Sequence, residues 1–134
     1  MGGLVRQVTA AVIIEDGRLL ITRRAPGQSL EGLWELPGGK IEPNETPQQC
    51  LVRELSEELA MSATVGDVIA QTTHHYDHGS FEMLAMETTR GSGFELRVHD
   101  AFAWVAAEEI VEYPLAPADV ELLKQMVWGQ SWSR

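Results

Sequence analysis

The sequence has a single cysteine, no long run of apolar residues and no leader-like beginning. One cysteine, Cys50, excludes a disulfide bond within the chain, which is typical of proteins in a reducing compartment. No apolar stretch approaches the roughly 18 residues that a membrane-spanning helix needs. The first residues, MGGLVRQV, lack the basic and apolar regions of a secretory signal. We therefore expect a cytoplasmic protein that makes no contact with a membrane.

Basic side chains are also scarce. Ten Lys and Arg stand against twenty Asp and Glu, and the formal net charge is −10. Nucleic-acid polymers and anionic membranes are bound through basic patches, so this balance argues against both as partners. A small phosphorylated substrate stays compatible with the charge if a divalent cation screens the repulsion.

The apolar content is sufficient for one ordinary domain. The 134 residues are 44% hydrophobic and contain no internal repeat, low-complexity tract or linker-like segment, so we expect a single domain over residues 1–134. Strand-like and helix-like segments are mixed without a regular βαβ alternation. This pattern predicts an α/β (α+β) fold, with a mixed sheet between helices.

Apolar periodicity places the expected elements along the chain. Asp16-Gly17 between two apolar runs is a strong hairpin signal, because both residues tolerate a positive φ. Strands are expected over 8–14, 19–22, 33–36, 65–73, 81–88 and 101–105. A short helical turn is expected over 106–110, a closing helix over 118–127 and a frayed tail over 131–134.

A further helix is predicted to begin at Pro47. Thr46 is a fitting N-cap, Pro47 suits the first helical position, and Gln49 completes a T-x-x-Q capping box. Leucines recur every four residues and predict the buried stripe of this helix: Leu51, Leu55 and Leu59.

Another face of the same helix carries three glutamates. Glu54, Glu57 and Glu58 stand at i, i+3 and i+4, and such side chains repel one another by roughly 0.2–0.5 kcal/mol per pair on an open helix. Arg53 offsets part of the repulsion by reaching Glu57 at i+4. A hard cation such as Mg²⁺ or Mn²⁺ would make the cluster favourable. From the helix alone a solvated acidic patch is the alternative. Gly38-Gly39, directly after a strand, can add a bare carbonyl near the acids.

The spacing of these residues resembles the signature of the Nudix hydrolases. The residues that carry it are Gly39, Glu45, Arg53, Glu54, Leu55, Glu57 and Glu58. The stretches ITRRA and WELPGGKIEPNETP look like the MutT branch of that family. WVAAEEIVEYPLAPAD is similar to the MutT-like CTP pyrophosphohydrolases and 8-oxo-dGTP diphosphatases, so the resemblance covers nearly the whole chain. It implies an α/β/α sandwich around a mixed sheet.

The resemblance also implies a reaction and the residues that carry it. A nucleoside triphosphate, of the 8-oxo-dGTP or the CTP and dCTP type, would give the monophosphate and pyrophosphate with Mg²⁺ or Mn²⁺. The implied catalytic residues are Arg53, Glu54, Glu57 and Glu58. The implied metal ligands are the Gly38 carbonyl, Glu54, Glu57 and Glu58, supported by Gly39 and Glu45. The implied substrate contacts are Arg24, Lys40 and Asp119.

Two positions depart from the family pattern. Ala60 stands where the family has a glycine that ends the helix in the left-handed conformation, which costs another residue roughly 1 kcal/mol. Val98 stands where close relatives carry an acid, and Glu95 and Asp100 are the candidate replacements.

Several features keep a structural alternative. Arg24 is also compatible with a surface cation, and Asp119 with an N-cap or first-turn acid of the closing helix. Tyr76, Phe81 and Met83 fit packing better than a base pocket. The adjacent histidines of THHYDH point to opposite faces of a strand, which disfavours a shared zinc ion.

Other functions and the oligomeric state stay open at this point. A non-catalytic Nudix-like module that binds nucleotides is disfavoured because Glu54, Glu57 and Glu58 are all present. Hydrolysis of ADP-ribose or a dinucleotide is disfavoured by the short chain. The protein is expected to be a monomer or a homodimer, and Trp128 and Trp132, expected to be exposed, are candidates for a dimer contact.

Overall fold

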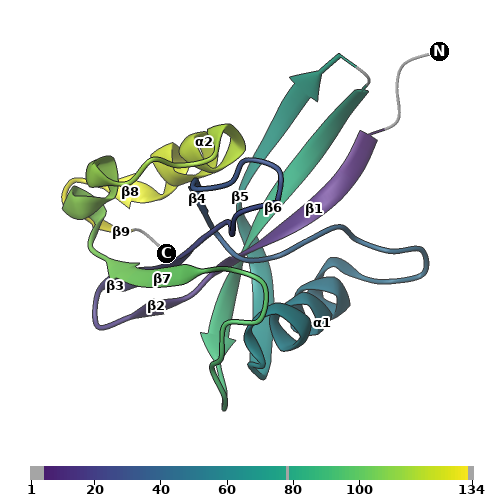
Figure 1. Ribbon diagram of the computed structural model, residues 1–134, viewed down its shortest axis with the longest axis horizontal. Helices are drawn as coiled ribbons and strands as arrows, with labels where there is room; N and C mark the ends of the chain where they lie inside the picture. Colours follow the sequence, from purple (N-terminus) through teal and green to yellow (C-terminus); the bar gives the residue numbers. More distant parts are fainter. Residues whose placement is uncertain (1–4, 78, 133–134) are drawn as a thin grey trace.

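The computed structural model describes residues 5–77 and 79–132, which form two sheets, a small ribbon and flanking helices (Figure 1). The longer strands are β1 (Val5–Val12), β3 (Arg18–Arg23), β5 (Ala63–Tyr76), β6 (Gly79–Arg90) and β7 (Ala101–Val105). The short strands are β2 (Ile14–Glu15), β4 (Trp34–Glu35), β8 (Val127–Trp128) and β9 (Ser131–Trp132). The helices are α1 (Pro47–Leu59), the 3₁₀ helix η1 (Ala107–Glu112) and α2 (Pro117–Met126). None of the helices described here is long and apolar enough to cross a membrane.

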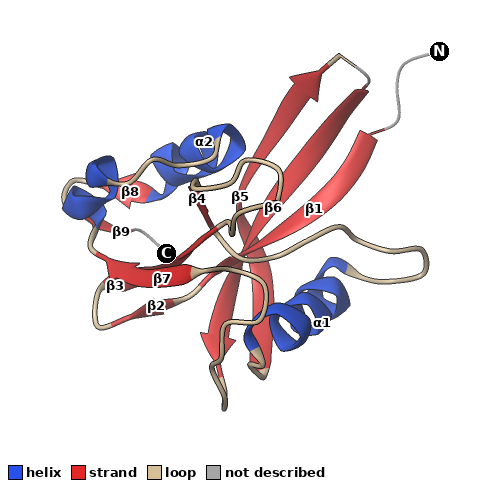
Figure 2. Ribbon diagram, in the orientation of Figure 1, coloured by secondary structure: helices blue, strands red, loops and turns tan. Residues whose placement is uncertain are grey.

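The strands build a mixed arrangement. The first sheet has the order β1-β6-β5, in which β1 runs parallel to β6 and β5 runs antiparallel to it. The second has the order β2-β3-β4, and β7 also pairs with β3. Figure 2 shows the strands in the middle of the molecule, with α1 and α2 on opposite sides. The predicted fold class, a mixed sheet between helices, is therefore confirmed.

Side chains of β1 alternate between two apolar clusters. Ala10 and Val12 belong to the cluster that includes α2, whereas Ala11 belongs to the cluster that includes α1. The predicted leucine stripe fills the second cluster: Leu51, Leu55 and Leu59 are fully buried. Burial of each leucine contributes roughly 1.5–3 kcal/mol relative to an exposed side chain. The stripe fixes which face of α1 turns inward, and so fixes the direction of its glutamates.

The local signals for the hairpin and the helix start are confirmed. Asp16 and Gly17 have φ angles of 52° and 75° in the turn between β2 and β3. Thr46 Oγ1 accepts from the Gln49 amide at 3.1 Å, and the Gln49 side chain accepts from the Thr46 amide at 2.9 Å. This reciprocal pair is the predicted capping box.

The expected frayed tail is wrong for the part that the structure describes. Ser131–Trp132 pairs with Val127–Trp128, and Trp132 is buried with its indole Nε1 donating to the Val105 carbonyl at 3.0 Å. A buried indole whose N–H has a partner outweighs the tendency of a chain end to fray. The expectation of an exposed Trp132 is therefore wrong, whereas Trp128 is 78% exposed. The last two residues lie outside the described part.

α1 ends in the left-handed conformation that is typical of glycine, although the residue at this position is Ala60. Ala60 has φ 50° and ψ 39°, in the left-handed region. Its amide donates to the Ser56 carbonyl at 3.1 Å, and the Met61 amide donates to the Leu55 carbonyl at 3.3 Å. The first of these is the hydrogen bond that defines the αL ending of a helix, and the second satisfies one more carbonyl of the last turn. The departure at Ala60 thus leaves the helix ending regular, at a backbone cost of roughly 1 kcal/mol.

Candidate active site

Arg53 organises the acidic face of α1. Its guanidinium donates to both carboxylate oxygens of Glu45, at 2.7 and 2.9 Å, and to Glu54 Oε1 at 2.9 Å. It also donates to Glu57 Oε2 at 3.4 Å, which confirms the predicted i+4 contact. Hydrogen bonding from Arg53 is the main cause that lowers the pKa of Glu45 to about 2. Arg53 and Glu45 therefore join the loop before α1 to the helix that carries the acids.

The glycine pair allows this loop to pack tightly against β1 and α1. A Cβ atom on Gly38 would clash with the Thr9 carbonyl, and one on Gly39 would lie 2.6 Å from the carboxylate oxygens of Glu54. The carbonyls on either side of Gly38 accept hydrogen bonds from amides of β1, each at 2.8 Å. Within residues 5–77 and 79–132 the Gly38 carbonyl accepts no backbone hydrogen bond, so its oxygen is available to a ligand.

Cys50 is buried beneath the same loop. Its Sγ lies 3.4 Å from Thr9 Oγ1 and 3.3 Å from the Lys40 carbonyl oxygen. Burial raises the pKa of the thiol. The side chain thus fills the space between α1, β1 and the glycine loop as a neutral group.

Glu58 is the most deeply placed of the three glutamates. Its side chain is 13% exposed, against 16% for Glu54 and 60% for Glu57. Burial is the main cause that raises the pKa of Glu58 to about 9, and the neighbouring Glu54 carboxyl raises it further. Two carboxyl groups that are in contact and mostly screened from solvent favour either a shared proton or a bound cation.

The oxygen atoms gathered at this site are of the kind that binds hard cations, but the Glu57 carboxylate does not lie among them. Carboxylate and carbonyl oxygens at Gly38, Glu54 and Glu58 are the ligand types that Mg²⁺ accepts. Among the described residues, no three His, Cys, Asp or Glu side chains are gathered closely enough to hold a metal ion. The exposed Glu57 side chain contacts Arg53 instead. Its rotation toward Glu58 is the change that would add a third carboxylate.

The segment after β6 closes the far side of the acids. Backbone amides of Glu95 and Arg97 donate to carbonyls at the end of α1, at 2.7 and 2.9 Å. These bonds satisfy helix-end groups that have no partner within the helix. They also bring His99 inward, where its Nε2 lies 2.9 Å from Glu35 Oε2 and 3.8 Å from Glu58 Oε1.

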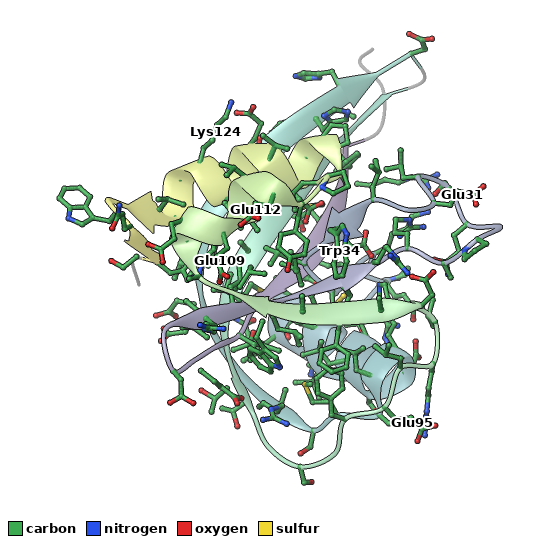
Figure 3. The ribbon with its side chains drawn as sticks, turned by 60° about the vertical axis from the view of Figure 1, so that its left-hand side comes forward. Glu31, Trp34, Glu95, Glu109, Glu112 and Lys124 are labelled. Atoms are coloured by element: carbon green, nitrogen blue, oxygen red, sulfur yellow. The ribbon has the colours of Figure 1, made fainter. Side chains whose placement is uncertain are left out.

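The two candidate replacements for the missing acid have other surroundings. Asp100 forms an ion pair with Arg23 at 2.8 Å, and Glu95 is exposed at the edge of the molecule (Figure 3). The residue that reaches Glu58 from this segment is His99, which the sequence alone did not single out. Glu35 was missed as well, although it stands in the stretch WELPGG, three positions before the first glycine of the pair. That position was the available signal.

A cavity of about 440 Å³ lies beside the acids. Its walls include Arg24, Glu35, His74, Phe81, Met83 and Asp119. Arg24 donates to both carboxylate oxygens of Glu35, at 3.1 and 3.3 Å, and to Ser29 Oγ at 3.2 Å. Arg24 is therefore a fixed part of the cavity wall and not a free surface cation. Phe81 and Met83, for which the sequence favoured packing over a base pocket, do both: Met83 packs against the core, Phe81 packs against His74, and the two side chains also line the cavity.

Asp119 lines this cavity from the first turn of α2. It is 2% exposed, and its Oδ1 accepts from the Leu36 amide at 2.9 Å. The N-cap of α2 is Ala116, so the N-cap alternative for Asp119 is wrong and the first-turn position is right. Burial raises the pKa of Asp119 to about 7, and the Glu35 charge adds to the shift. A carboxyl group that titrates near neutrality can accept or donate a hydrogen bond at a base edge.

The histidine-rich stretch contributes one described residue to the cavity. The His74 ring lies 5.3 Å from the Phe81 ring, centroid to centroid, and both line the wall. His78 and the side chain of Tyr76 lie outside the part that is described.

Comparison with known proteins shows the family. The family model of the NUDIX domain matches residues 9–125. The chain is 40% identical over 119 residues to the CTP pyrophosphohydrolase of Escherichia coli K12, with 88% of each chain covered. It is 34% identical over 120 residues to the putative 8-oxo-dGTP diphosphatase 2 of Mycobacterium tuberculosis, with 84% of this chain and 81% of the relative covered.

Solved structures give the same fold. The solution structure of the E. coli ORF135 protein aligns with a TM-score of 0.82 at 38% identity, over 90% of this chain and 87% of that one. The MutT protein of Methanosarcina mazei aligns with a TM-score of 0.81 over 93% and 94%, and at 24% identity it supports the fold alone.

The family model, the curated relatives and the solved structures thus agree on both sequence and fold. The chain belongs to the Nudix hydrolase family. Within that family it is MutT-like, and it is an enzyme that hydrolyses phosphoric anhydrides.

Proposed function

We propose that the protein hydrolyses nucleoside triphosphates to the monophosphate and pyrophosphate with Mg²⁺, or with Mn²⁺ in its place. The observation that supports this most is the half-buried Glu54–Glu58 pair next to a cavity that is lined by Arg24 and Asp119. Acidic residues that could bind a cation, and through it the phosphates, thus lie next to residues that could bind a nucleotide base. The names of the relatives favour substrates of the CTP and dCTP type or the 8-oxo-dGTP type.

The acids and Arg53 divide the catalytic work in this proposal. Glu54, Glu58 and the Gly38 carbonyl would hold Mg²⁺, and Glu57 would join them. The cation, when bound, supplies neutralisation of the phosphate charge. Glu54 is the candidate to orient or deprotonate the attacking water. Arg53 keeps the Glu54 carboxylate in position through the 2.9 Å hydrogen bond.

The substrate would extend from the acids into the cavity. Lys40, directly after the glycine pair, would contact a phosphate. Asp119 would hydrogen-bond the base edge, and Arg24 would line the same pocket. Phe81 and Met83 offer apolar surface to the ring.

The test is a nucleotide panel with Mg²⁺ in which pyrophosphate and inorganic phosphate are measured separately. CTP, dCTP, 8-oxo-dGTP, dGTP and ADP-ribose form the panel. Pyrophosphate release that is lost in Glu58→Gln and in EDTA supports the proposal. Tight nucleotide binding without turnover would instead identify a non-catalytic nucleotide-binding module, and cleavage of ADP-ribose alone would identify a different nucleoside diphosphate hydrolase.

The setting of the reaction is also a proposal. The net charge of −10 favours a small nucleotide over a nucleic-acid polymer or a membrane as partner. A cytoplasmic location agrees with the single buried thiol. Monomer and homodimer both fit, and the exposed Trp128 is the first position to examine in a dimer.

A further inference from the structure

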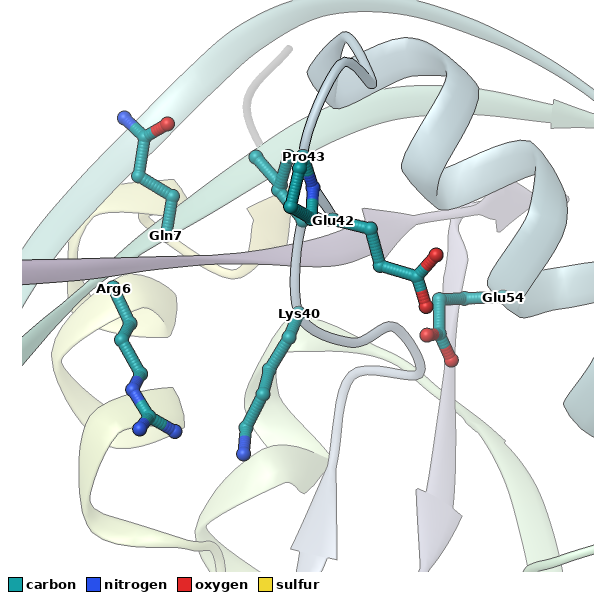
Figure 4. A pocket seen from close by; sticks show the side chains of 7 residues that line it. Arg6, Gln7, Lys40, Glu42, Pro43 and Glu54 are labelled. Carbon is teal, nitrogen blue, oxygen red and sulfur yellow. The ribbon is translucent and has the colours of Figure 1, made fainter.

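Arg6 and Lys40 lie side by side although 33 other residues separate them in the sequence. The start of β1 and the loop after the glycine pair are joined by backbone hydrogen bonds: Thr9 to Gly39 at 2.8 Å and Ile41 to Gln7 at 3.0 Å. Between these bonds Val8 pairs antiparallel with Lys40. Arg6 stands two positions before Val8 and therefore shares its face of the strand. Figure 4 shows the Arg6 and Lys40 side chains extending in the same direction, and Gln7 in the opposite one.

Both cations lack a carboxylate partner in the described part of the chain, despite twenty acids against ten basic residues. The basic residues that form ion pairs are Arg23, Arg24, Arg53, Arg90 and Lys124. Arg6 and Lys40 are both exposed, and neither forms an ion pair with a residue that is described. Two adjacent unpaired cations repel each other, and a bound anion turns this repulsion into attraction.

The same two residues belong to both cavities next to the site. One cavity, of about 870 Å³, is lined by Arg6, Lys40, Glu42 and Glu54 on the acidic side. The other is the 440 Å³ cavity of Arg24 and Asp119, and Arg6 and Lys40 line it too. Arg6 and Lys40 therefore lie where the two cavities adjoin.

We propose that Arg6 binds the phosphate chain of the substrate together with Lys40, as a second cation that the motif residues do not include. This inference rests on the proposed nucleotide hydrolysis for its substrate class. The guanidinium offers a planar pair of donors, which suits two phosphate oxygens, whereas the Lys40 ammonium acts as a point charge. Arg6 therefore favours ligands with two or three linked phosphates over the nucleoside monophosphate that leaves.

The binding test uses inorganic tripolyphosphate with Mg²⁺, measured by calorimetry on the full chain. The variant is Arg6→Ala, and the matched control is Arg18→Ala, because Arg18 is an exposed strand arginine that lines neither cavity. Arg6→Ala is expected to weaken tripolyphosphate binding about tenfold, which corresponds to the loss of one charge-assisted hydrogen-bonded contact. Arg18→Ala is expected to bind as the wild type does. Equal binding by the two variants, or no binding by the wild type, overturns the proposal.

The kinetic test uses CTP and 8-oxo-dGTP. Arg6→Ala is expected to raise KM about tenfold and change kcat less than threefold, and Arg6→Lys to recover part of the loss. The dependence of KM on salt becomes shallower in Arg6→Ala, a readout that a purely structural role leaves unchanged. If no nucleotide is turned over while Arg6→Ala still weakens tripolyphosphate, the proposed function fails and the anion site stands. A KM equal to that of Arg18→Ala overturns the role of Arg6.

Discussion

The acidic face of α1 and the cavity of Asp119 are built in different ways. The acidic face comes from one continuous stretch, from Gly38 to Glu58, held by contacts such as Arg53–Glu45, eight positions apart. The cavity is assembled from β1, β4, β5, β6 and α2. Asp119 reaches its partner amide across 83 positions. The acidic half of the candidate site is therefore a local structure, whereas the cavity that we propose to bind the base depends on the whole fold.

Both halves hold a carboxyl group with a raised pKa. The two groups differ in what would lower the free-energy cost of their burial, a cation in one case and a proton in the other. Glu58 lies against a second carboxyl group, that of Glu54, so a bound cation would cancel the repulsion between the two carboxylates. Among the described residues Asp119 shares no hydrogen bond with another carboxyl group, and burial is the main cause of its raised pKa, so a proton lowers the cost of burying it. The first arrangement suits catalysis by charge neutralisation, and the second suits hydrogen-bond recognition.

The largest expected effect is a difference in kcat between variants of Glu58, which is mostly screened from solvent, and Glu57, which is exposed. Glu58→Gln should lower kcat by about 10³-fold and raise the Mg²⁺ requirement, because the buried charge that faces the cation is lost. Glu57→Gln, at the exposed end of the same face, should lower kcat by about tenfold. Steady-state kinetics over a Mg²⁺ titration measure both. Equal losses in the two variants would contradict the burial ranking.

The next effect concerns stability and pH. The folded pKa of Asp119, about 7, lies above the unfolded value of 3.8, so its stabilising contribution is present below pH 4 and is lost as pH rises through about 7. In Asp119→Asn this contribution does not titrate, while the acceptor for Leu36 remains. From pH 4 to 8 the wild type should lose up to about 4 kcal/mol more stability than the variant.

Urea unfolding in EDTA at intervals across that range measures the difference. EDTA keeps metal binding out of both curves. Parallel stability curves for the two proteins would show that Asp119 is ionised throughout and that its burial does not control its protonation.

A smaller effect is expected on substrate recognition. Asp119→Ala should raise the KM for the preferred nucleotide by about tenfold, or shift base preference, since one buried hydrogen-bond partner is removed. The Mg²⁺ dependence should stay as it is, because Asp119 belongs to the cavity and not to the acids. Asp67→Ala, an exposed acid on β5, is the control. An unchanged KM and preference would remove Asp119 from the pocket.

The smallest effect is at the end of α1. Ala60→Gly should raise the free energy of unfolding by about 1 kcal/mol, because glycine adopts the left-handed conformation without a Cβ penalty. Thermal unfolding detects this as a higher Tm. A lower Tm would mean that the entropy of the unfolded glycine exceeds the strain that it relieves.

The features that the sequence could predict are those that depend on local contacts, and the features that it missed depend on long-range ones. The helix start at Thr46, the leucine stripe and the Arg53–Glu57 contact all depend on neighbours within one or two turns, so spacing was sufficient. His99 and Glu35 meet across 64 positions, and no local pattern carries that contact. Trp132 was misjudged for the same reason, because its burial depends on the Val105 carbonyl in β7.

The buried Cys50 has a practical consequence for following this site in solution. Its thiol is enclosed by α1, Thr9 of β1 and the Lys40 carbonyl, so a thiol reagent reaches it only after the glycine loop separates from the strand. The rate of labelling at the single cysteine therefore reports how often the loop opens. A nucleotide or Mg²⁺ that holds the loop closed slows that rate, so the labelling of one native residue follows the occupancy of the site.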